Sequence, residues 1–237
     1  MEKIEKRLQE LAQAVGISLS GPQLGKFQRY LELLLVWNEK VNLTAITEPQ
    51  EVVIKHFLDS LLLLNTVSLK QGAKVIDVGT GAGFPGIPLK ISRPDLDLTL
   101  LDSLNKRLVF LQELLKELEL SAETVHCRAE EGGRKKELRG KFDFVTARAV
   151  APLNLLCEYC LPFLKVGGIF AAMKGPNCSE EIEAAKKAIG ILGAEIKEKK
   201  ELNLPDGSGR TIIVLKKCKE TSDRYPRISA KIAKNPL

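Results

Sequence analysis

A glycine-rich turn at residues 79–86 carries the residue types and spacing that most clearly imply chemistry. Gly79, Gly81 and Gly83 alternate directly after an apolar run at 75–78, and a second apolar run follows at 87–91. This order predicts a buried strand, a turn whose backbone can approach a ligand without a Cβ in the way, and a helix whose first amide groups point toward that ligand. We expect Gly81 to lie where the ligand meets the backbone. The turn therefore predicts a nucleotide-cofactor site.

Two interpretations of the turn name different cofactors. Gly81, Gly83 and Gly86 match the G-x-G-x-x-G pattern of dinucleotide sites, which keeps an NAD-linked oxidoreductase as an alternative. Counted from Gly79, the glycine that directly follows the strand, the pattern is Gly-x-Gly-x-Gly with Asp77 before it. A pyrophosphate has no need for an acid there. The ammonium and sulfonium groups of S-adenosylmethionine can use one, directly or through water, so we favour S-adenosylmethionine.

Further polar residues follow the ends of the next predicted strands. Asp102 ends the second strand, where a carboxylate can accept both ribose hydroxyls of a nucleoside. The stretch 128–130, which includes Ala129 and Glu130, follows the third strand and suits a loop around an adenine. Arg148 ends the fourth strand, where open α/β sheets place reactive groups. These positions favour one site along the carboxyl edge of the sheet.

Each of these residues also has a purely structural interpretation. Asp77 could bind backbone amides of its own turn, Asp102 could cap the helix that follows it, and Arg148 could be an ion-pair partner. His56 and Asp59 lie three positions apart, on one helical face. An acid–base pair is conceivable there, but we favour a hydrogen-bonded pair that joins the helical part of the chain to the sheet.

Cysteine spacing gives no support to a metal site. Cys157-x-x-Cys160 resembles half of a zinc site, but no second pair exists and both cysteines fall inside an apolar helix. We therefore expect core packing and no metal.

Periodicity predicts an α/β fold. Strand patterns at 73–78, 97–102, 123–127, 142–146 and 167–172 alternate with helical patterns, which predicts a parallel sheet with helices on both faces. Two further strands, at 194–201 and 211–216, are joined by a loop short enough only for an antiparallel hairpin. The prediction is a Rossmann-like class I S-adenosylmethionine-dependent methyltransferase sheet, mostly parallel with an antiparallel last strand.

The sheet region is flanked by two segments of different character. Residues 1–68 show helical patterns alone, at 2–15, from Pro22 to about Asn38 and again from Pro49, and predict an N-terminal helical region. Residues 69–218 form the cofactor-binding domain. Residues 219–237 form a basic C-terminal tail, in which Arg224 and Arg227 flank an aromatic residue. That tail is either a solvated end or an RNA contact.

Composition excludes several classes of protein. The 237 residues are 44% hydrophobic and 28% charged, with no apolar run long enough to span a membrane and no signal-peptide pattern. Five cysteines without framework spacing fit reduced thiols. We expect a cytoplasmic protein, which we take to be a monomer. The net charge of +6 is compatible with a polyanionic partner.

Several longer motifs resemble the RsmG (GidB) family of bacterial methyltransferases, which modify N7 of a guanine in 16S ribosomal RNA of the small ribosomal subunit. The resemblance covers nearly the whole chain and lies in the motifs at 37–44, 56–60, 77–89, 101–107, 147–153, 173–175 and 225–227. It implies S-adenosylmethionine as cofactor, held by Gly79, Phe84, Ala129, Glu130 and Arg148. One departure is the stretch 228–231, where we would expect glycine and proline after Tyr-Pro-Arg.

The sequence lacks an obvious general base or nucleophile, which agrees with methyl transfer to guanine N7. Guanine N7 is an unprotonated lone pair at neutral pH, so its attack on a sulfonium methyl needs no general base, only alignment. No Asn-Pro-Pro-Tyr-like stretch follows the fourth strand, and Pro152 is followed by leucine rather than a nucleophilic cysteine. We name no catalytic residue, and take Arg148 and Lys174 as substrate-side candidates, with Lys174, Arg224 and Arg227 as RNA contacts.

Three alternatives remain open at this level. One is the NAD-linked oxidoreductase, the second is a non-catalytic RNA-binding or ribosome-assembly factor on the same fold, and the third is a methyltransferase for a small molecule or a protein. The residues themselves name neither the modified nucleotide nor the form of the substrate, naked RNA or assembled subunit.

Overall fold

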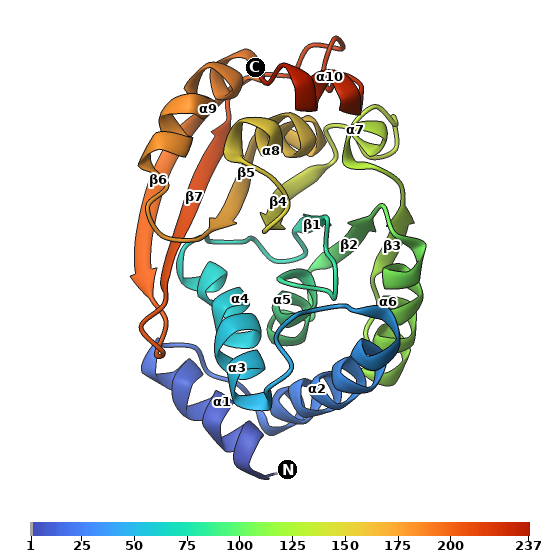
Figure 1. Cartoon of the computed structure of the whole chain (residues 1–237), viewed down its shortest axis with the longest axis vertical. Coiled ribbons are helices and arrows are strands. Elements are labelled where there is room, and N and C mark those ends of the chain that lie inside the picture. The colour runs from blue at the N-terminus through green and yellow to red at the C-terminus, as the bar shows by residue number, and fades with distance from the viewer. Residues whose placement is uncertain (1) are drawn as a thin grey trace.

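A seven-stranded sheet forms the centre of the computed structural model, which describes residues 2–237 (Figure 1). The strands lie in the order β3-β2-β1-β4-β5-β7-β6. Their bounds are β1 Lys74–Val78, β2 Asp97–Asp102, β3 Glu123–His126, β4 Phe142–Arg148, β5 Leu164–Lys174, β6 Ala194–Asn203 and β7 Gly209–Lys217. All seven predicted strands are present, and the main difference is that β4 to β7 run longer than predicted, β5 the most.

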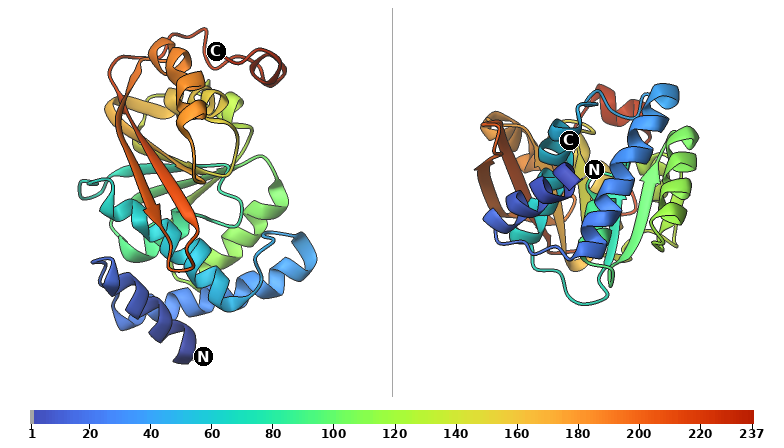
Figure 2. Two further views of the ribbon diagram at one scale, coloured as in Figure 1. Left: turned by 60° about the vertical axis from the view of Figure 1, so that its left-hand side comes forward. Right: turned by 90° about the horizontal axis from the view of Figure 1, so that it is seen from below.

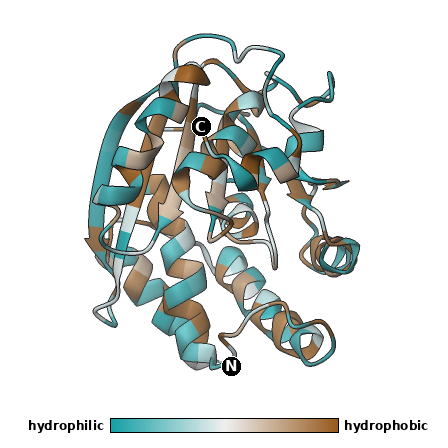
Figure 3. Ribbon diagram, turned by 45° about the horizontal axis from the view of Figure 1, so that its top comes forward, coloured by the Kyte–Doolittle hydropathy of each residue, from teal (hydrophilic) through white to brown (hydrophobic). Residues whose placement is uncertain are grey.

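The direction of the strands confirms the predicted sheet type. Strands β1 to β5 pair in parallel, whereas β7 is antiparallel to both of its neighbours, β5 and β6. Strand β6 is one of the two edge strands, largely exposed and mostly hydrophilic in Figure 3. Because β7 returns through a short hairpin after β6 and inserts beside β5, it is the one reversed strand of the sheet.

Helices cover both faces of this sheet (Figure 2). One face carries α1 Glu2–Ala14, α2 Gly21–Val41, the helical segment 49–65, α5 Gly86–Ser92 and α6 Asn105–Glu117. The other carries α7 Ala129–Gly132, α8 Leu153–Cys160 with the short 3-10 turn Leu161–Phe163, and α9 Ser179–Ile191. A short helix α10, Ser229–Lys234, follows the sheet. Alternate residues of the strands point to the two faces, so each face has its own apolar core.

The N-terminal helices share a core with the sheet. Their buried residues belong to the same apolar cluster as one face of the central strands. Helix α2 begins at a capping box formed by Ser20 and Gln23. The helix ends at Val41, three residues later than predicted, where Asn42 adopts a left-handed conformation and donates its backbone N–H to the Asn38 carbonyl.

The helical segment 49–65 is irregular in a way that matters for the site. It consists of α3 Pro49–Val52, a π-helical turn Val53–Leu58, α4 Asp59–Leu61 and a 3-10 turn Leu62–Asn65. Single π-helical turns are frequent at functional sites, where the extra residue redirects the side chains that follow. Here the turn carries His56, and Asp59 follows it directly.

Two predictions about special segments, the cysteine pair and the C-terminal segment, have clear outcomes. Cys157 and Cys160 are fully buried in α8, which confirms core packing. Among residues 2–237, no group of three or more metal-binding side chains comes together, and no helix is long and apolar enough to cross a membrane. The C-terminal segment is not a solvated end, because Ile232 is fully buried and Tyr225 packs on the second core.

Candidate functional site

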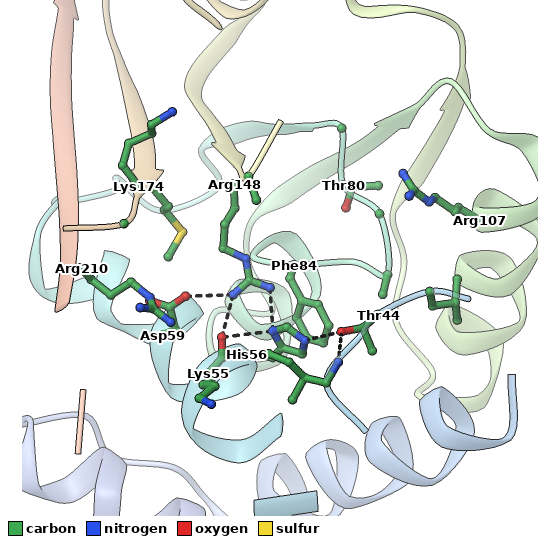
Figure 4. Close-up of a pocket in the computed structure, with 18 residues that line it drawn as sticks. Thr44, Lys55, His56, Asp59, Thr80, Phe84, Arg107, Arg148, Lys174 and Arg210 are labelled. Carbon is green, nitrogen blue, oxygen red and sulfur yellow. Dashed lines mark hydrogen bonds and ion pairs between the residues drawn. The ribbon is translucent and has the colours of Figure 1, made fainter. Parts of the chain in front are cut away.

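A cavity of about 460 Å³ opens at the carboxyl ends of β1, β4 and β5, between the sheet and the helical segment 49–65 (Figure 4). The predicted site residues Gly79, Gly81, Phe84, Arg148 and Lys174 all line it. The cavity is also lined by close neighbours of these residues, namely Thr80, Ala82, Ala149, Met173 and Gly175, and by residues from four other parts of the chain: Leu43, Thr44, Ile46, Lys55, His56, Asp59, Arg107 and Arg210.

The four glycines of the turn divide into two pairs with different tasks. Gly79 and Gly81 have positive φ values of +70° and +60° and line the cavity. A Cβ added to Gly81 would meet only the Gly79 carbonyl, at 4.0 Å, so it would point into open space. At Gly83 and Gly86 an added Cβ would lie under 3.0 Å from packed side chains, including Leu111 and Leu100 respectively. The first pair faces the cavity, although an added Cβ on Gly79 would come within 2.7 Å of Val150, and the second pair lets the turn pack on the protein.

Asp77 shapes the turn through hydrogen bonds of one carboxylate oxygen to the turn itself. It is fully buried, and its Oδ2 accepts hydrogen bonds from the Thr80 hydroxyl at 2.7 Å and the Gly86 amide at 2.9 Å. Burial raises the pKa of this carboxyl to about 6. The Gly86 amide begins α5, so the predicted free amide at the start of that helix is already occupied. The structural interpretation of Asp77 is therefore the one that the geometry supports.

Asp102 also binds the backbone of the turn. Its Oδ2 accepts from the Gly81 amide at 2.9 Å and from Arg107 at 3.3 Å, and its Oδ1 accepts from the Leu104 amide at 2.9 Å. The residue is almost completely buried. The two aspartates at the tips of β1 and β2 thus hold Gly81 and Gly86 in place from opposite sides.

Arg148 lies at the centre of a polar network in the cavity (Figure 4). Its guanidinium donates to Asp59 Oδ2 at 3.0 Å and to the Lys55 carbonyl at 3.2 Å, and it lies 3.2 Å from His56 Nδ1. It also stands over the Phe84 ring, 5.0 Å from its centroid. Asp59 is shared with Arg210 of β7, at 3.3 Å. His56 and Asp59 therefore join the helical segment to the sheet, as predicted, but each does so through Arg148 and not through the predicted hydrogen bond between the two side chains.

Burial and charge set the protonation of this network. Burial, with Arg148 adding to it, lowers the pKa of His56 to about 3, so this imidazole is neutral at physiological pH. Its Nε2 lies 2.8 Å from the Thr44 hydroxyl. Burial raises the pKa of Asp59 above its ordinary value, and the two arginines oppose that rise. The ion pairs with Arg148 and Arg210 occupy both oxygens of Asp59.

Phe84 forms part of the wall between the cavity and the N-terminal helices. Its ring stacks on His56, with centroids 4.5 Å apart, and on Tyr30, with centroids 5.2 Å apart. The Tyr30 hydroxyl donates to the Ala82 carbonyl. Only 5% of Phe84 is exposed, so a ligand in the cavity would meet a small part of this residue.

A second, smaller cavity of about 200 Å³ adjoins the first at Gly79. It contains the predicted residues Ala129 and Glu130, which begin α7 after β3. Val150, in the loop after β4, lines this cavity and lies over Gly79, where an added Cβ would come within 2.7 Å of its Cγ2. The remaining lining residues are Val78, Leu101, Ser103, Cys127, Arg128, Tyr159 and Ser229.

The three predicted RNA contacts differ in whether their charged groups are bound within the protein or exposed. The Lys174 ammonium is engaged by the Ala151 carbonyl at 2.8 Å and by Glu181 at 2.5 Å. Arg227 forms a paired contact with the buried Glu158, through Nε at 2.9 Å and Nη2 at 2.7 Å. Arg224 is exposed.

Sequence patterns missed four polar residues that the fold brings to the first cavity: Thr44, Lys55, Arg107 and Arg210. Arg107 lies in the first turn of α6 and forms an ion pair with Asp102. Its position in the sequence, five residues after the end of β2, could therefore have indicated that it belongs to the site. Arg210 is the second residue of β7, and Thr44 lies in the loop after α2. Arg210 lies in no motif, and the motif at 37–44 that ends with Thr44 gives no sign of the cavity, because only the folding of distant segments brings these two residues there.

Comparison with known proteins identifies relatives over the whole chain. A family model described as rRNA small subunit methyltransferase G (GidB) matches residues 23–208. The chain is 50% identical over 232 residues to ribosomal RNA small subunit methyltransferase G of Alkaliphilus oremlandii, covering 97% of each protein. It is 51% identical over 237 residues to the protein of that name from Acetivibrio thermocellus, covering 99% of this chain and 97% of the relative.

Solved structures support the fold independently. The crystal structure of M. jannaschii TYW2 in complex with AdoMet superposes with a TM-score of 0.51 at 16% identity, over 62% of this chain and 70% of that one. At this identity the similarity concerns the fold alone. The matched family model and the two close relatives carry the assignment, and the chain belongs to the GidB family of ribosomal RNA small subunit methyltransferases G.

Proposed function

We propose that this protein transfers a methyl group from S-adenosylmethionine to N7 of a specific guanine in 16S ribosomal RNA of the small ribosomal subunit. The observation that carries the proposal is a pair of cavities joined at Gly79, in a chain half identical to curated small-subunit rRNA methyltransferases. We further propose that it acts in the cytoplasm, where ribosomal subunits are found, and as a monomer. Light scattering of the purified protein tests the monomer, and a dimer mass would contradict it.

The residues of the two cavities fit the proposed cofactor. The second cavity has apolar walls at Val78 and Leu101 and would hold the adenine, beside Ala129 and Glu130. Gly79 belongs to both cavities, and Gly81 offers open space in the first, where the amino-acid end would lie. Asp102 would accept the ribose hydroxyls only by sharing oxygens that already bind Gly81 and Leu104.

In the proposed reaction, the protein's role is to position the cofactor and the guanine for methyl transfer. S-adenosylmethionine supplies a methyl group on a sulfonium, which guanine N7 can attack without losing a proton. No general base is therefore required, and the cavity offers none that is free: His56 is held between Thr44 and Arg148, and Asp59 is shared by two arginines. Arg148 would act by holding Phe84 and His56 as one wall of the substrate space.

The dinucleotide alternative loses its main support in this geometry. Of the three glycines in its pattern, Gly83 and Gly86 pack against neighbouring side chains. The Gly86 amide, which would face a phosphate, is hydrogen-bonded to Asp77. The antiparallel β7 also departs from an all-parallel dehydrogenase sheet.

Label transfer tests the proposed activity. Small subunits lacking the modification are incubated with the protein and S-adenosylmethionine labelled in the methyl group. We expect label in 16S ribosomal RNA, released by nuclease and not by protease, and mass mapping that places one methyl on guanine N7. Binding of S-adenosylhomocysteine without any label transfer would favour a non-catalytic assembly factor. Label in protein or in a small molecule would change the substrate class.

The first prediction concerns Gly81. Gly81→Val places a branched side chain in the open space of the first cavity and strains a backbone with φ +60°. We expect the dissociation constant for S-adenosylhomocysteine to rise by about tenfold or more in calorimetric titration. Gly140→Val is the matched control, because Gly140 has φ +63°, also has open space around it, and lines neither cavity. Equal affinities in the two variants would contradict this placement of the cofactor.

The second prediction concerns RNA. We propose that Arg224 contacts phosphate, since its side chain is exposed, whereas Arg227 and Lys174 are engaged in ion pairs. Arg224→Ala should lower RNA affinity and reduce the slope of log affinity against log salt by about one, with no change in cofactor affinity. Lys197→Ala, which removes an exposed charge from the edge strand β6, is the control. An unaltered salt slope in Arg224→Ala would remove this segment from the RNA interface.

The third prediction concerns pH. The pKa of His56 is about 3 in the folded protein and near 6.5 when unfolded, so below about pH 6.5 the unfolded state binds more protons. Folding stability should therefore fall as the pH drops, by at most about 1.4 kcal/mol per pH unit from this group. His56→Gln should flatten that loss in urea unfolding curves between about pH 4.5 and 7.

His126→Gln serves as the comparison, because His126 is exposed and is the only other histidine. We expect it to retain the pH dependence of the wild-type protein. The same slope in His56→Gln as in the wild type would show that His56 is not held neutral.

A further inference from the structure

The C-terminal segment, defined as residues 219–237, is fixed to the protein by a buried ion pair. The guanidinium of Arg227 contacts both carboxylate oxygens of Glu158 on α8, and the Arg227 backbone amide donates to the same carboxylate at 2.7 Å. The Glu158 side chain is 1% exposed. A carboxylate buried to this extent needs its partner, so the ion pair holds the segment against α8.

A second clamp holds the beginning of the segment. Arg139 donates to the backbone carbonyls of Thr221 at 2.6 Å, Ser222 at 3.2 Å and Tyr225 at 2.8 Å. Pro226 packs against Gly133 so closely that an added Cβ there would lie 3.2 Å from its Cγ. The chain from Thr221 to Arg227 is thus anchored along its length, just before α10 begins.

This anchoring places α10 at the second cavity. Ser229, its first residue, lines that cavity together with Tyr159, which lies on α8 one residue after Glu158. Ala129 and Glu130 line the same cavity. Burial raises the pKa of the Tyr159 phenol, the Glu130 carboxylate adds to the rise, and the Ser229 hydroxyl opposes it. The four residues therefore form one local environment.

We propose that the C-terminal segment is part of the cofactor site, with Ser229 and Tyr159 forming the wall of the cavity against which the adenine of S-adenosylmethionine lies. This inference rests on the proposed function and deepens it. Ser229 falls within 228–231, the stretch that departs from the sequence we expected after Tyr-Pro-Arg. The inference about this wall therefore rests on residues of this chain and not on the motif that we expected after Tyr-Pro-Arg.

The chemistry of the cavity suits a purine. An adenine has two apolar faces and an edge with one amino donor and several acceptor nitrogens. Val78 and Leu101 offer apolar surface, and the hydroxyls of Ser229 and Tyr159 can each donate or accept a hydrogen bond. The same two residues are half-buried, which favours a ligand inside the cavity over an RNA strand on the surface.

Filling the cavity from α10 tests the inference. In Ser229→Tyr the larger side chain would occupy the space assigned to the adenine. We expect the dissociation constants for S-adenosylhomocysteine and for 5′-methylthioadenosine, which lacks the amino-acid end, to rise by the same factor of about ten or more. Ala230→Tyr is the matched control, since Ala230 is the next residue of α10, is exposed, and does not line the cavity. It should bind both ligands as the wild type does.

The outcomes separate this inference from the proposed function. If the wild-type protein binds no S-adenosylhomocysteine, the proposed cofactor is wrong and the inference falls with it. If the wild type binds it and Ser229→Tyr binds it equally well, the inference alone is overturned. A loss for S-adenosylhomocysteine without a loss for 5′-methylthioadenosine would also overturn it, because the contact would then lie outside the adenosine half.

Hydrogen exchange of the unmodified protein gives a test that needs no variant. S-adenosylhomocysteine should slow amide exchange in residues 228–234 as well as at the glycine turn. Protection of the turn with unchanged exchange in α10 would contradict the inference even if Ser229→Tyr failed to fold.

Discussion

The ion pair between Arg148 and Asp59 is the interaction on which the shape of the site depends. The two side chains are 13% and 4% exposed, and they come from the end of β4 and from the helical segment after its π-helical turn. Removing one partner of such a buried pair costs about 3–5 kcal/mol, because the other charge stays buried. Asp59 also binds Arg210 of β7, and Arg148 also lies over the Phe84 ring. This one ion pair therefore connects the helical segment, β7 and the glycine turn at the wall of the cavity.

Two other carboxylates show how the glycine turn is held in shape. Asp77 lies one residue before the end of β1, Asp102 ends the neighbouring parallel strand β2, and each accepts a backbone amide from the glycine turn between them. Glycines are especially flexible in the unfolded chain, so ordering the turn costs a large loss of conformational entropy, which the two acceptors help to offset. The acids thus act on the backbone, and the backbone in turn lines the first cavity.

Local patterns predicted the fold well and the site only partly. Strand and helix periodicity gave all seven strands and the reversed β7, because each signal lies within a few consecutive residues. The residues that follow strand ends, such as Gly79, Arg148 and Lys174, were predicted to share one site and do share it. Thr44, Arg210 and Ser229 were not predicted, since tertiary packing alone brings them to the cavities. The ionic partners of Arg227 and Lys174 were missed for the same reason.

The charges of the cavity are consistent with the product of the proposed reaction. Methylation of N7 leaves a positive charge on the guanine, which unpaired cations nearby would disfavour. Five cations line the first cavity, and each has an acidic partner: Lys55 with Glu51, Arg107 with Asp102, Arg148 and Arg210 with Asp59, and Lys174 with Glu181. His56 adds no charge because burial holds it neutral. In these pairs the five cations share four carboxylates, which offset all but one of their charges, so under the proposed function most attraction for the RNA backbone would come from exposed groups outside the cavity.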